Sequence, residues 1–290
     1  MFGHEKMGRL AIIAGSGKLP LYVAEAARRS GEDPYIFALK DEANADWSGY
    51  EHIRIGLGEI AQFKRLATQL GIGRIVMSGG VSRRPPITEI SLGLKGLLKL
   101  PTIIRKLAGG GDNTVLTGVI ELLETEHRRV ISVQDIAPTL LAELGPVGKV
   151  SPDKDSLRDI AAGARAARLI GQLDIGQGAI AVGGRVVALE GPEGTDAMID
   201  RIGELKRAGR VSPRRRGVLV KLCKPQQDMR VDLPSAGLAT LRNAHAAGLA
   251  GVALEAGRAL LLDIDEVRAF ADANGLFVTG IDPDIRVAGT

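Results

Sequence analysis

The first half of the chain alternates short apolar runs with longer stretches in which apolar residues recur at helical spacing. Residues 9–14 (RLAIIA) form one such run, which ends in Gly15, Ser16 and Gly17 before a helical pattern begins at Leu19. A strand, a glycine turn and a helix in that order form the unit from which parallel sheets are built. Further strands are predicted at 35–39, 74–77 and 130–133, and helices at 60–70 and 114–126. The pattern therefore predicts an α/β fold whose N-terminal part is a doubly wound, Rossmann-like parallel sheet.

The second half has a different pattern, and turn-forming residues mark where it begins. Gly145 and Pro146 are followed by the polar segment 151–155, so we divide the chain into an N-terminal domain, residues 1–145, and a C-terminal domain, residues 146–290. Gly183 and Gly184 separate two apolar runs, which is the signal of a two-residue β-hairpin. Strands are predicted at 179–182, 185–189 and 218–222, helices at 157–170, 198–205 and 238–247, and a second hairpin at 252–255 and 259–262 that turns at Ala256 and Gly257. Local pairing of this kind predicts an α+β domain with a mixed or antiparallel sheet.

Composition limits the kinds of partner and location. Aromatic residues make up only 3% of the chain and do not interleave with the arginines at 83–84 and 214–216, so a nucleic-acid-binding surface is not expected. Cys223 is the single cysteine and cannot form an intrachain disulfide, which fits a reducing compartment. Residues 1–6 lack the apolar core of a secretion signal, and no uninterrupted apolar run reaches about eighteen residues. We expect a cytoplasmic protein that does not span the membrane.

Glycine-rich loops follow two of the predicted N-terminal strands. Gly15, Ser16 and Gly17 precede a helix, where backbone N–H groups and the helix dipole favour an anion. The loop matches neither the dinucleotide fingerprint nor the P-loop, and a tight turn is the alternative interpretation. The second loop contains Gly79 and Gly80 and follows the strand predicted at 74–77. Because parallel strands end at the same edge of a sheet, we expect it to lie beside the first loop. The candidate substrate-binding residues of the N-terminal domain are Gly15, Ser16, Gly17, Gly79, Gly80, Arg83 and Asp112.

Polar residues cluster around the strands of the second half. Asp228 and Asp232 lie in a loop that follows a predicted strand, and we predict that they hold Mg²⁺ and carry catalysis, because this cation is bound by carboxylates together with substrate phosphates. Lysines in the same loop would neutralise phosphate oxygens, whereas a solvated charged loop is the alternative. The candidate substrate-binding residues of the C-terminal domain are Gln177, Glu190, Thr195, Asp196, Lys221, Lys224 and Gln227.

Other catalytic patterns are missing from the sequence. No histidine is spaced to activate Cys223 as a nucleophile, and the four histidines match no zinc-binding pattern. No serine lies in a nucleophile-elbow motif. Metal-assisted attack of water on phosphorus is the chemistry that the remaining residues favour.

Six segments, in order and spread over nearly the whole chain, resemble the LpxI-type UDP-2,3-diacylglucosamine pyrophosphatases of lipid A biosynthesis. The glycine motifs are individually weak evidence, whereas the last two segments are distinctive, and the chain departs from the family pattern only before Met7. The segments are 13–20 (IAGSGKLP), 79–83 (GGVSR), 111–113 (GDN), 174–177 (DIGQ), 190–196 (EGPEGTD) and 224–234 (KPQQDMRVDLP).

The resemblance implies a two-domain enzyme with its site between the domains. It implies Mg²⁺-dependent hydrolysis of UDP-2,3-diacylglucosamine to 2,3-diacylglucosamine 1-phosphate (lipid X) and UMP, with water attacking the phosphorus nearer the sugar. Asp228 and Asp232 map onto the acidic catalytic loop of the family, and the resemblance does not divide the roles between them.

A diacylated substrate also implies an apolar surface. The leucine-rich segment 91–107, with Lys95, Lys99, Arg105 and Lys106, is a candidate for peripheral contact with the cytoplasmic face of the inner membrane, and a core helix is the alternative. The sequence leaves a homodimer open.

Two other functions are weighed against hydrolysis. A nucleotide-dependent oxidoreductase or transferase would use the Gly15 loop, but the incomplete dinucleotide fingerprint argues against it. A non-catalytic carrier of a nucleotide sugar or lipid would not need the acidic loop around Asp228 and Asp232.

Overall fold

The computed structural model describes residues 8–82 and 112–282. The chain divides into two compact units. Unit 1 comprises Met1–Pro138 together with Asp228–Asp232, and unit 2 comprises Thr139–Gln227 and Leu233–Thr290. A short piece of the second half of the chain, residues 228–232, therefore packs with the first half.

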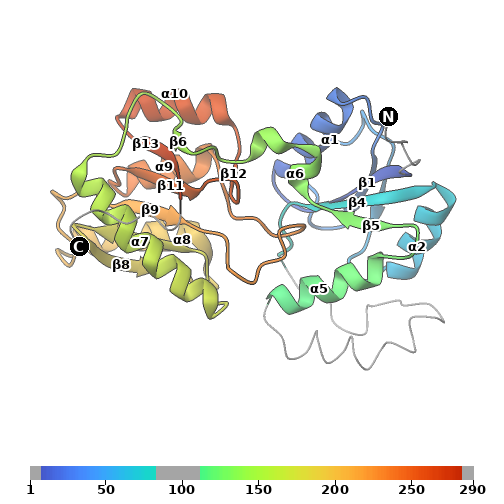
Figure 1. The fold of residues 1–290 in the computed structure, drawn as a ribbon, viewed down its shortest axis with the longest axis horizontal. Coiled ribbons are helices and arrows are strands. Elements are labelled where there is room, and N and C mark those ends of the chain that lie inside the picture. Colours follow the sequence, from blue (N-terminus) through green and yellow to red (C-terminus); the bar gives the residue numbers. More distant parts are fainter. Residues whose placement is uncertain (1–7, 83–111, 283–290) are drawn as a thin grey trace. The chain divides into compact units, whose positions relative to one another are not determined.

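Unit 1 is built on a five-stranded sheet in the order β3-β2-β1-β4-β5, and every neighbouring pair of strands is parallel (Figure 1). This confirms the predicted doubly wound sheet. The strand order reverses between β1 and β4, and the carboxyl ends of strands at such a switch point are where α/β proteins bind ligands. The strands are β1 (Arg9–Ala14), β2 (Tyr35–Leu39), β3 (His52–Ile55), β4 (Ile72–Ser78) and β5 (Arg129–Ile131). The helices are α1 (Leu19–Arg29), α2 (Ile60–Gln69), α5 (Asp112–Leu123) and α6 (Val133–Ile136), and a 3-10 turn, η2 (Pro138–Leu140), follows them.

Helices cover both faces of the unit 1 sheet. In Figure 1, α2 and α5 lie on one side of the strands and α1 and α6 on the other. Phe63 of α2 and Ile120 of α5 pack with Phe37 and Ile75 of the sheet in one buried cluster. Successive strand residues point to opposite faces, so a parallel sheet covered on both sides needs nearly continuous apolar strands. The sequence of β1 meets that requirement.

Unit 2 is built on a six-stranded mixed sheet in the order β6-β13-β11-β9-β7-β8. The central strands β13, β11 and β9 are parallel, whereas β6, β7 and β8 pair antiparallel with their neighbours. A separate pair, β10 and β12, is parallel. The strands are β6 (Gly145–Pro146), β7 (Gly178–Val182), β8 (Arg185–Leu189), β9 (Val218–Lys221), β10 (Ser235–Ala236), β11 (Gly251–Glu255), β12 (Leu260–Leu261) and β13 (Phe277–Ile281). The helices are α7 (Lys154–Gln172), α8 (Gly194–Arg207), α9 (Leu238–Ala246) and α10 (Ile264–Asn274).

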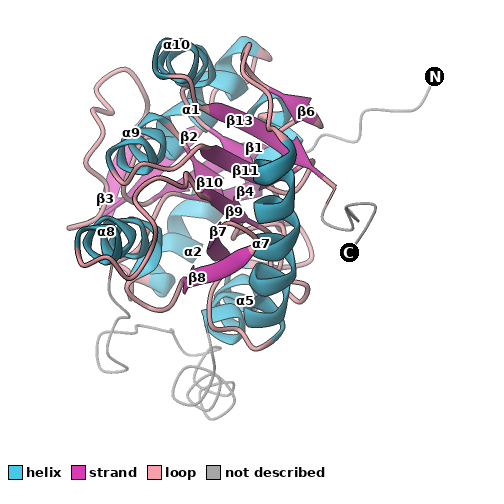
Figure 2. Ribbon diagram, turned by 90° about the vertical axis from the view of Figure 1, so that its left-hand side faces the viewer, coloured by secondary structure: helices cyan, strands magenta, loops and turns pink. Residues whose placement is uncertain are grey.

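The two faces of the unit 2 sheet have separate cores. Val218 and Val220 of β9 pack with Ile160 of α7, whereas Leu219, between them, packs with Met198 and Ile202 of α8 on the opposite face. Figure 2 shows α7 alone on one side of this sheet and α8, α9 and α10 on the other. Period-two alternation therefore divides a wholly buried strand between two helical layers.

The predicted hairpin at Gly183 and Gly184 is confirmed. β7 and β8 pair antiparallel, and both glycines have positive φ angles, of 65° and 79°. A two-residue hairpin of this type needs positive φ at both central positions, which glycine reaches without steric cost.

The predicted second hairpin, 252–255 with 259–262, is wrong. β11 lies between β9 and β13 and is parallel to both, so neither of its edges is open to the following segment. That segment instead forms β12, which pairs with β10. Of the two predicted turn residues only Gly257 has a positive φ, because Ala256 carries a β-carbon. Strands β3 and β13 and helix α10 were not predicted.

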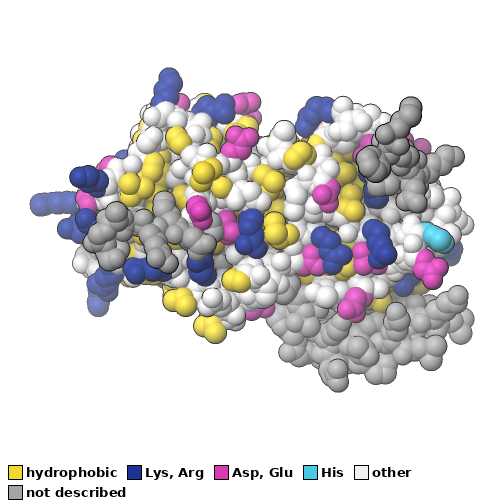
Figure 3. All heavy atoms as spheres, in the orientation of Figure 1, with side chains coloured by type: hydrophobic (Ala, Val, Ile, Leu, Met, Phe, Trp, Pro, Cys, Tyr) yellow, Lys and Arg dark blue, Asp and Glu magenta, His cyan; other side chains and the backbone are white. Residues whose placement is uncertain are grey.

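One face of the protein carries charged side chains of both signs. Figure 3 shows basic and acidic side chains interspersed over the face in view.

In the part of the chain that the structure describes, no helix is long and apolar enough to cross a membrane.

Candidate functional site

The two glycine loops of unit 1 meet at the carboxyl edge of its sheet, as the sequence predicted. Ala14 and Ser78, the last residues of β1 and β4, are register partners, and an antiparallel bridge joins Ser16 to Gly80 just beyond them. The amide of Ser16 donates to the Gly80 carbonyl at 2.8 Å, and the amide of Gly80 donates to the Ser16 carbonyl at 3.0 Å. The Gly15 amide donates to the Ser78 carbonyl at 2.8 Å. The amides of Gly15, Ser16 and Gly80, which belong to candidate substrate-binding residues, thus donate to backbone carbonyls within the junction.

Close backbone approach explains the glycines at this junction. A β-carbon on Gly15 would lie 2.3 Å from the Gly80 carbonyl oxygen, and one on Gly79 would lie 2.6 Å from the Ser16 carbonyl oxygen. Gly17 has open space around it and a φ of +84°, so there the requirement is conformational. Gly17 precedes Lys18, the N-cap of α1, and the N-terminus of this helix still suits an anion.

Two buried polar atoms at the same edge were not predicted as site residues. The hydroxyl of Ser78, at the end of β4, and the Oε1 atom of Gln134, in α6, are buried and have no hydrogen-bond partner among the described residues. Leaving such groups unpaired is costly, so a donor from a ligand would stabilise both. In the sequence, the one indication of a role for Ser78 is that it ends an apolar strand just before Gly79 and Gly80.

The predicted residues of unit 2 also converge on one edge of a sheet. β9 and β11 are parallel and end at Lys221 and Glu255. β7 is antiparallel to β9, so it begins at this edge, with Gly178 opposite Lys221 and with the Gln177 carbonyl accepting from the Leu222 amide at 2.9 Å. β8 ends there as well, because the Glu190 amide donates to the Gly178 carbonyl at 2.9 Å.

Glu190 is the centre of a buried network at this edge. Its Oε1 accepts from the Thr195 hydroxyl at 2.6 Å and its Oε2 from the Gln177 amide at 3.3 Å. Thr195 does not cap α8, because the helix begins at Gly194 after Glu193. Asp196 points elsewhere and accepts from Asn243 of α9 at 3.0 Å.

The lysines of this edge have internal partners. Lys221 is buried and its ammonium donates to the Ser235 carbonyl at 3.0 Å. Lys224 forms an ion pair of 2.8 Å with Asp174, and its amide donates to the Gln227 side chain at 2.9 Å. An ammonium carries three donors, so the Asp174 pair leaves Lys224 able to bind an anion as well.

Glu255 is a residue of this edge that was not predicted. It is buried at the end of β11, its Oε2 accepts from the Cys223 amide at 2.8 Å, and its Oε1 pairs with Arg258 at 3.1 Å. The glutamate therefore fixes the start of the loop that runs on to residue 232. In the sequence, the only indication of this role was that Glu255 ends an apolar run.

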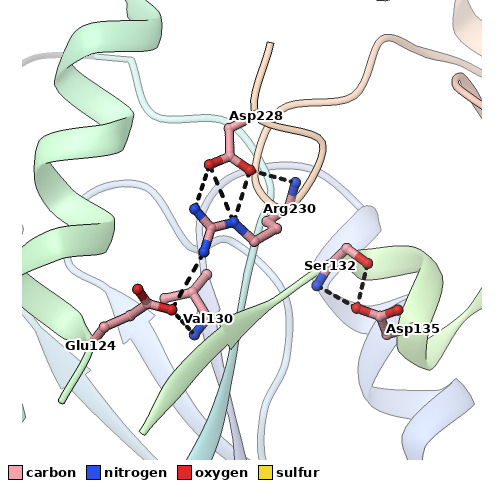
Figure 4. Close-up of polar contacts among 6 residues, drawn as sticks. All are labelled: Glu124, Val130, Ser132, Asp135, Asp228 and Arg230. Atoms are coloured by element: carbon pink, nitrogen blue, oxygen red, sulfur yellow. Dashed lines mark hydrogen bonds and ion pairs between the residues drawn. The ribbon is translucent and has the colours of Figure 1, made fainter. Parts of the chain in front are cut away.

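The two predicted catalytic aspartates belong to unit 1. Asp228 faces Arg230: the guanidinium Nε donates to Oδ1 at 2.9 Å and an outer nitrogen donates to Oδ2 at 2.6 Å (Figure 4). The hydrogen bonds from Arg230 hold the pKa of the Asp228 carboxyl below its usual range. Asp232 is half-buried, and its amide donates to the Asp228 carbonyl at 3.3 Å.

The fit of these residues to Mg²⁺ differs between the two aspartates. Both oxygens of Asp228 already accept from a cation, and a guanidinium beside them would repel a second one, so Asp228 does not fit as a ligand. Asp232 is a hard carboxylate donor and fits the usual arrangement of one or two carboxylates with substrate phosphates. Within residues 8–82 and 112–282, no three acidic, histidine or cysteine side chains gather to form a metal site made of protein alone.

Three earlier predictions lie outside what the structure describes. Arg83 and the proposed membrane-contact segment 91–107 fall in the undescribed range 83–111. Asp112 begins α5, but its side chain is not described.

These features define a two-domain α/β protein with a glycine junction at the switch point of a Rossmann-like sheet and a polar edge on a second, mixed sheet. The LpxI N-terminal domain model matches residues 9–140 and the LpxI C-terminal domain model matches residues 143–279. UDP-2,3-diacylglucosamine pyrophosphatase LpxI of Caulobacter vibrioides is 38% identical over 281 residues, which cover 97% of this chain and 100% of that protein. The chain belongs to the LpxI family.

Two solved structures resemble the chain only weakly. The TT0495 protein of Thermus thermophilus is 14% identical with a TM-score of 0.27, and the match covers 95% of this chain and 97% of that one. WbmH of Bordetella bronchiseptica, solved with NAD⁺, is 12% identical with a TM-score of 0.25, covering 40% of this chain and 36% of that one. Similarities at this level carry no argument about function.

Proposed function

We propose that this protein hydrolyses the pyrophosphate bond of UDP-2,3-diacylglucosamine to give 2,3-diacylglucosamine 1-phosphate (lipid X) and UMP. The observation that carries the proposal is the match to the named Caulobacter pyrophosphatase over the full length of that protein and 97% of this chain. A relative that shares both domains supports a shared activity more strongly than one that shares a fold alone.

Hydrolysis transfers the phosphoryl group nearer the sugar to water. A bond forms between the water oxygen and that phosphorus, and the bond from that phosphorus to the bridging oxygen breaks. UMP leaves with the bridging oxygen and its electron pair, and the protons of the water pass to solvent. Asp232 is the carboxylate that we assign to this step, and with the diphosphate oxygens it would hold Mg²⁺. A bound Mg²⁺ would neutralise charge that develops on the phosphoryl oxygens.

Other groups are assigned to substrate binding by their chemistry. At the edge of the unit 1 sheet, the N-terminus of α1 after Gly17 suits a phosphate, and the buried oxygens of Ser78 and Gln134 suit a donor such as a hydroxyl or an amide N–H. In unit 2, Lys224 is the candidate for an additional anionic contact. The proposed reaction implies work in the cytoplasm and transient contact with the inner membrane, which holds the acyl chains of substrate and product.

One assay tests the proposal. Purified full-length protein is incubated with UDP-2,3-diacylglucosamine and Mg²⁺ in detergent, with and without EDTA, and lipid X and UMP are quantified by mass spectrometry. We expect both products in equal amounts, with loss of turnover in EDTA and recovery when Mg²⁺ is restored. In water labelled with heavy oxygen, the label should appear in lipid X; label in UMP would mean attack on the other phosphorus.

Two comparisons define specificity. ATP and inorganic pyrophosphate should be turned over far more slowly than the glycolipid nucleotide, because binding energy from the lipid and sugar is needed to lower the barrier. Equal turnover of ATP would overturn the proposed substrate. Tight binding of UDP-2,3-diacylglucosamine without any hydrolysis would instead identify a carrier.

A further inference from the structure

Residues 228–232 form a short segment that packs with unit 1 although its neighbours in sequence belong to unit 2. The chain enters the segment after Gln227 and leaves it before Leu233. Five residues have little apolar surface of their own, so something specific must hold the segment in place. The contacts of its side chains and carbonyls show which residues hold the segment in place.

Arg230 is the centre of these contacts. Its Nε and one outer nitrogen donate to the two oxygens of Asp228, and its other outer nitrogen lies 3.4 Å from Oε1 of Glu124 (Figure 4). Each nitrogen of the guanidinium therefore faces a carboxylate. The two acidic groups outnumber the single cation, so this cluster is poorly suited to attract a phosphate.

Glu124 is a rigid anchor for this cluster. It directly follows α5, and its amide donates to the Ile120 carbonyl at 2.9 Å. Its Oε1 also accepts from the amide of Val130 in β5 at 3.1 Å. Backbone of a helix and of a strand thus fixes the carboxylate that holds Arg230.

Two further contacts hold the segment against the same unit. Val231 packs on the cluster that contains Ile120 and Val130. The Met229 carbonyl accepts from the Gln134 side chain at 3.4 Å.

The turn links Asp228 directly to Asp232. The Asp228 carbonyl accepts from the amides of Val231 at 3.1 Å and Asp232 at 3.3 Å. Fixing Asp228 therefore fixes the backbone from which the Asp232 side chain projects. A carboxylate must be held within a fraction of an ångström to act on a substrate, and such precision depends on supporting contacts.

We propose that Asp228 and Glu124 are positioning residues, which act through Arg230 to hold Asp232 in its working place and do not themselves touch substrate or metal. The proposal rests on the proposed function for the role of Asp232. It separates two aspartates that the sequence treats alike.

Activity measurements form the first half of the test. Asp228→Asn and Glu124→Gln should each lower kcat about tenfold with KM nearly unchanged, because a displaced carboxylate loses alignment. Any rise in the Mg²⁺ concentration for half-activation should be the same in both variants, since both displace Asp232. Asp228→Glu should restore most of kcat, since a longer carboxylate still pairs with Arg230. Asp265→Asn, which breaks the exposed 3.0 Å pair of Asp265 with Arg268, is the matched control and should keep full activity.

Hydrogen exchange forms the second half and does not depend on turnover. With millisecond-to-second labelling of the full chain, Asp228→Asn and Glu124→Gln should speed exchange of the Val231 and Asp232 amides about tenfold relative to wild type and to Asp265→Asn. If the two variants exchange faster but the wild-type protein hydrolyses no substrate, the proposed function is rejected while the holding role of the pair is retained.

Two results would overturn the inference. One is unchanged exchange of these amides in both variants. The other is a tenfold or larger rise in the Mg²⁺ concentration for half-activation of Asp228→Asn that Glu124→Gln does not share, with Asp228→Glu equally impaired, which would make Asp228 a metal ligand.

Discussion

Ser16 and Gly80, 64 residues apart in sequence, exchange backbone hydrogen bonds of 2.8 and 3.0 Å at the carboxyl edge of the unit 1 sheet. The Ser16 hydroxyl also donates to the Gly80 carbonyl, at 3.0 Å. This bridge extends the β1–β4 pairing into the two glycine loops and places the start of α1 beside the end of β4. The loops therefore form one joint structure rather than two flexible turns.

Gly15→Ala is expected to destabilise the protein by about 2–3 kcal/mol, because its β-carbon would overlap the Gly80 carbonyl and force the bridge apart. Urea unfolding of full-length protein measures the loss. Gly203→Ala is the control: Gly203 lies inside α8, where alanine should stabilise by about 0.5–1 kcal/mol. Equal stabilities for the two variants would mean that the junction adapts easily.

Asp232→Asn should reduce kcat on the order of a hundredfold or more while leaving thermal unfolding unchanged, because loss of the charge removes stabilisation that is needed in the transition state. Steady-state assays of UDP-2,3-diacylglucosamine hydrolysis at saturating Mg²⁺ provide the measurement. A variant that keeps more than about a tenth of wild-type kcat has lost less than about 1.4 kcal/mol of barrier stabilisation, too little for a metal ligand or a general base.

Thr195→Val should cost about 1–3 kcal/mol of stability, since it removes the hydroxyl that donates to the buried Glu190 carboxylate. Thr195→Ser keeps the donor and should stay within about 0.5 kcal/mol of wild type. Chemical denaturation of both variants separates the contribution of the hydroxyl to stability from that of the methyl group. If valine is tolerated as well as serine, Glu190 does not depend on Thr195.

Asp153→Ala should destabilise α7 by about 1 kcal/mol at neutral pH, because Asp153 caps the helix through a 2.8 Å bond from the Ser156 amide. That bond lowers the pKa of Asp153 from its ordinary value of 3.8. The stabilising contribution is therefore fully present above about 3.8 and is lost as the pH falls through the lower, folded-state pKa. The difference between wild type and Asp153→Ala, measured by urea unfolding from pH 7 to 3, should shrink toward the acid end, whereas a constant difference would exclude the charged cap.

Local patterns predicted much of this fold. The apolar run of β1, the glycine loop and α1 follow from short-range preferences, and so does the hairpin at Gly183 and Gly184, where both residues adopt positive φ. Convergence of the two glycine loops also followed, because parallel strands end at a common edge. The candidate residues Gln177, Glu190 and Lys221 came from their places at predicted strand ends.

Long-range choices were not predictable in the same way. The segment after β11 carries a turn glycine and an apolar run, yet β11 pairs with β9 and β13, because a fully buried central strand gains more from two parallel partners than from one local hairpin. Asp228 and Asp232 have the same side chain in the same loop. Among the described residues, the contacts of Arg230 with Asp228 and with Glu124, 106 residues away in sequence, distinguish them.

The sequence by itself determined the alternation of strands and helices, the glycine positions and the family resemblance, since each depends on residues close together in the chain or on ordered motifs. Only the tertiary structure decided which strands became neighbours, where residues 228–232 pack and which buried groups oppose one another. Those outcomes depend on burial and on pairing between distant residues, and a local pattern contains no information about which distant partner will be present.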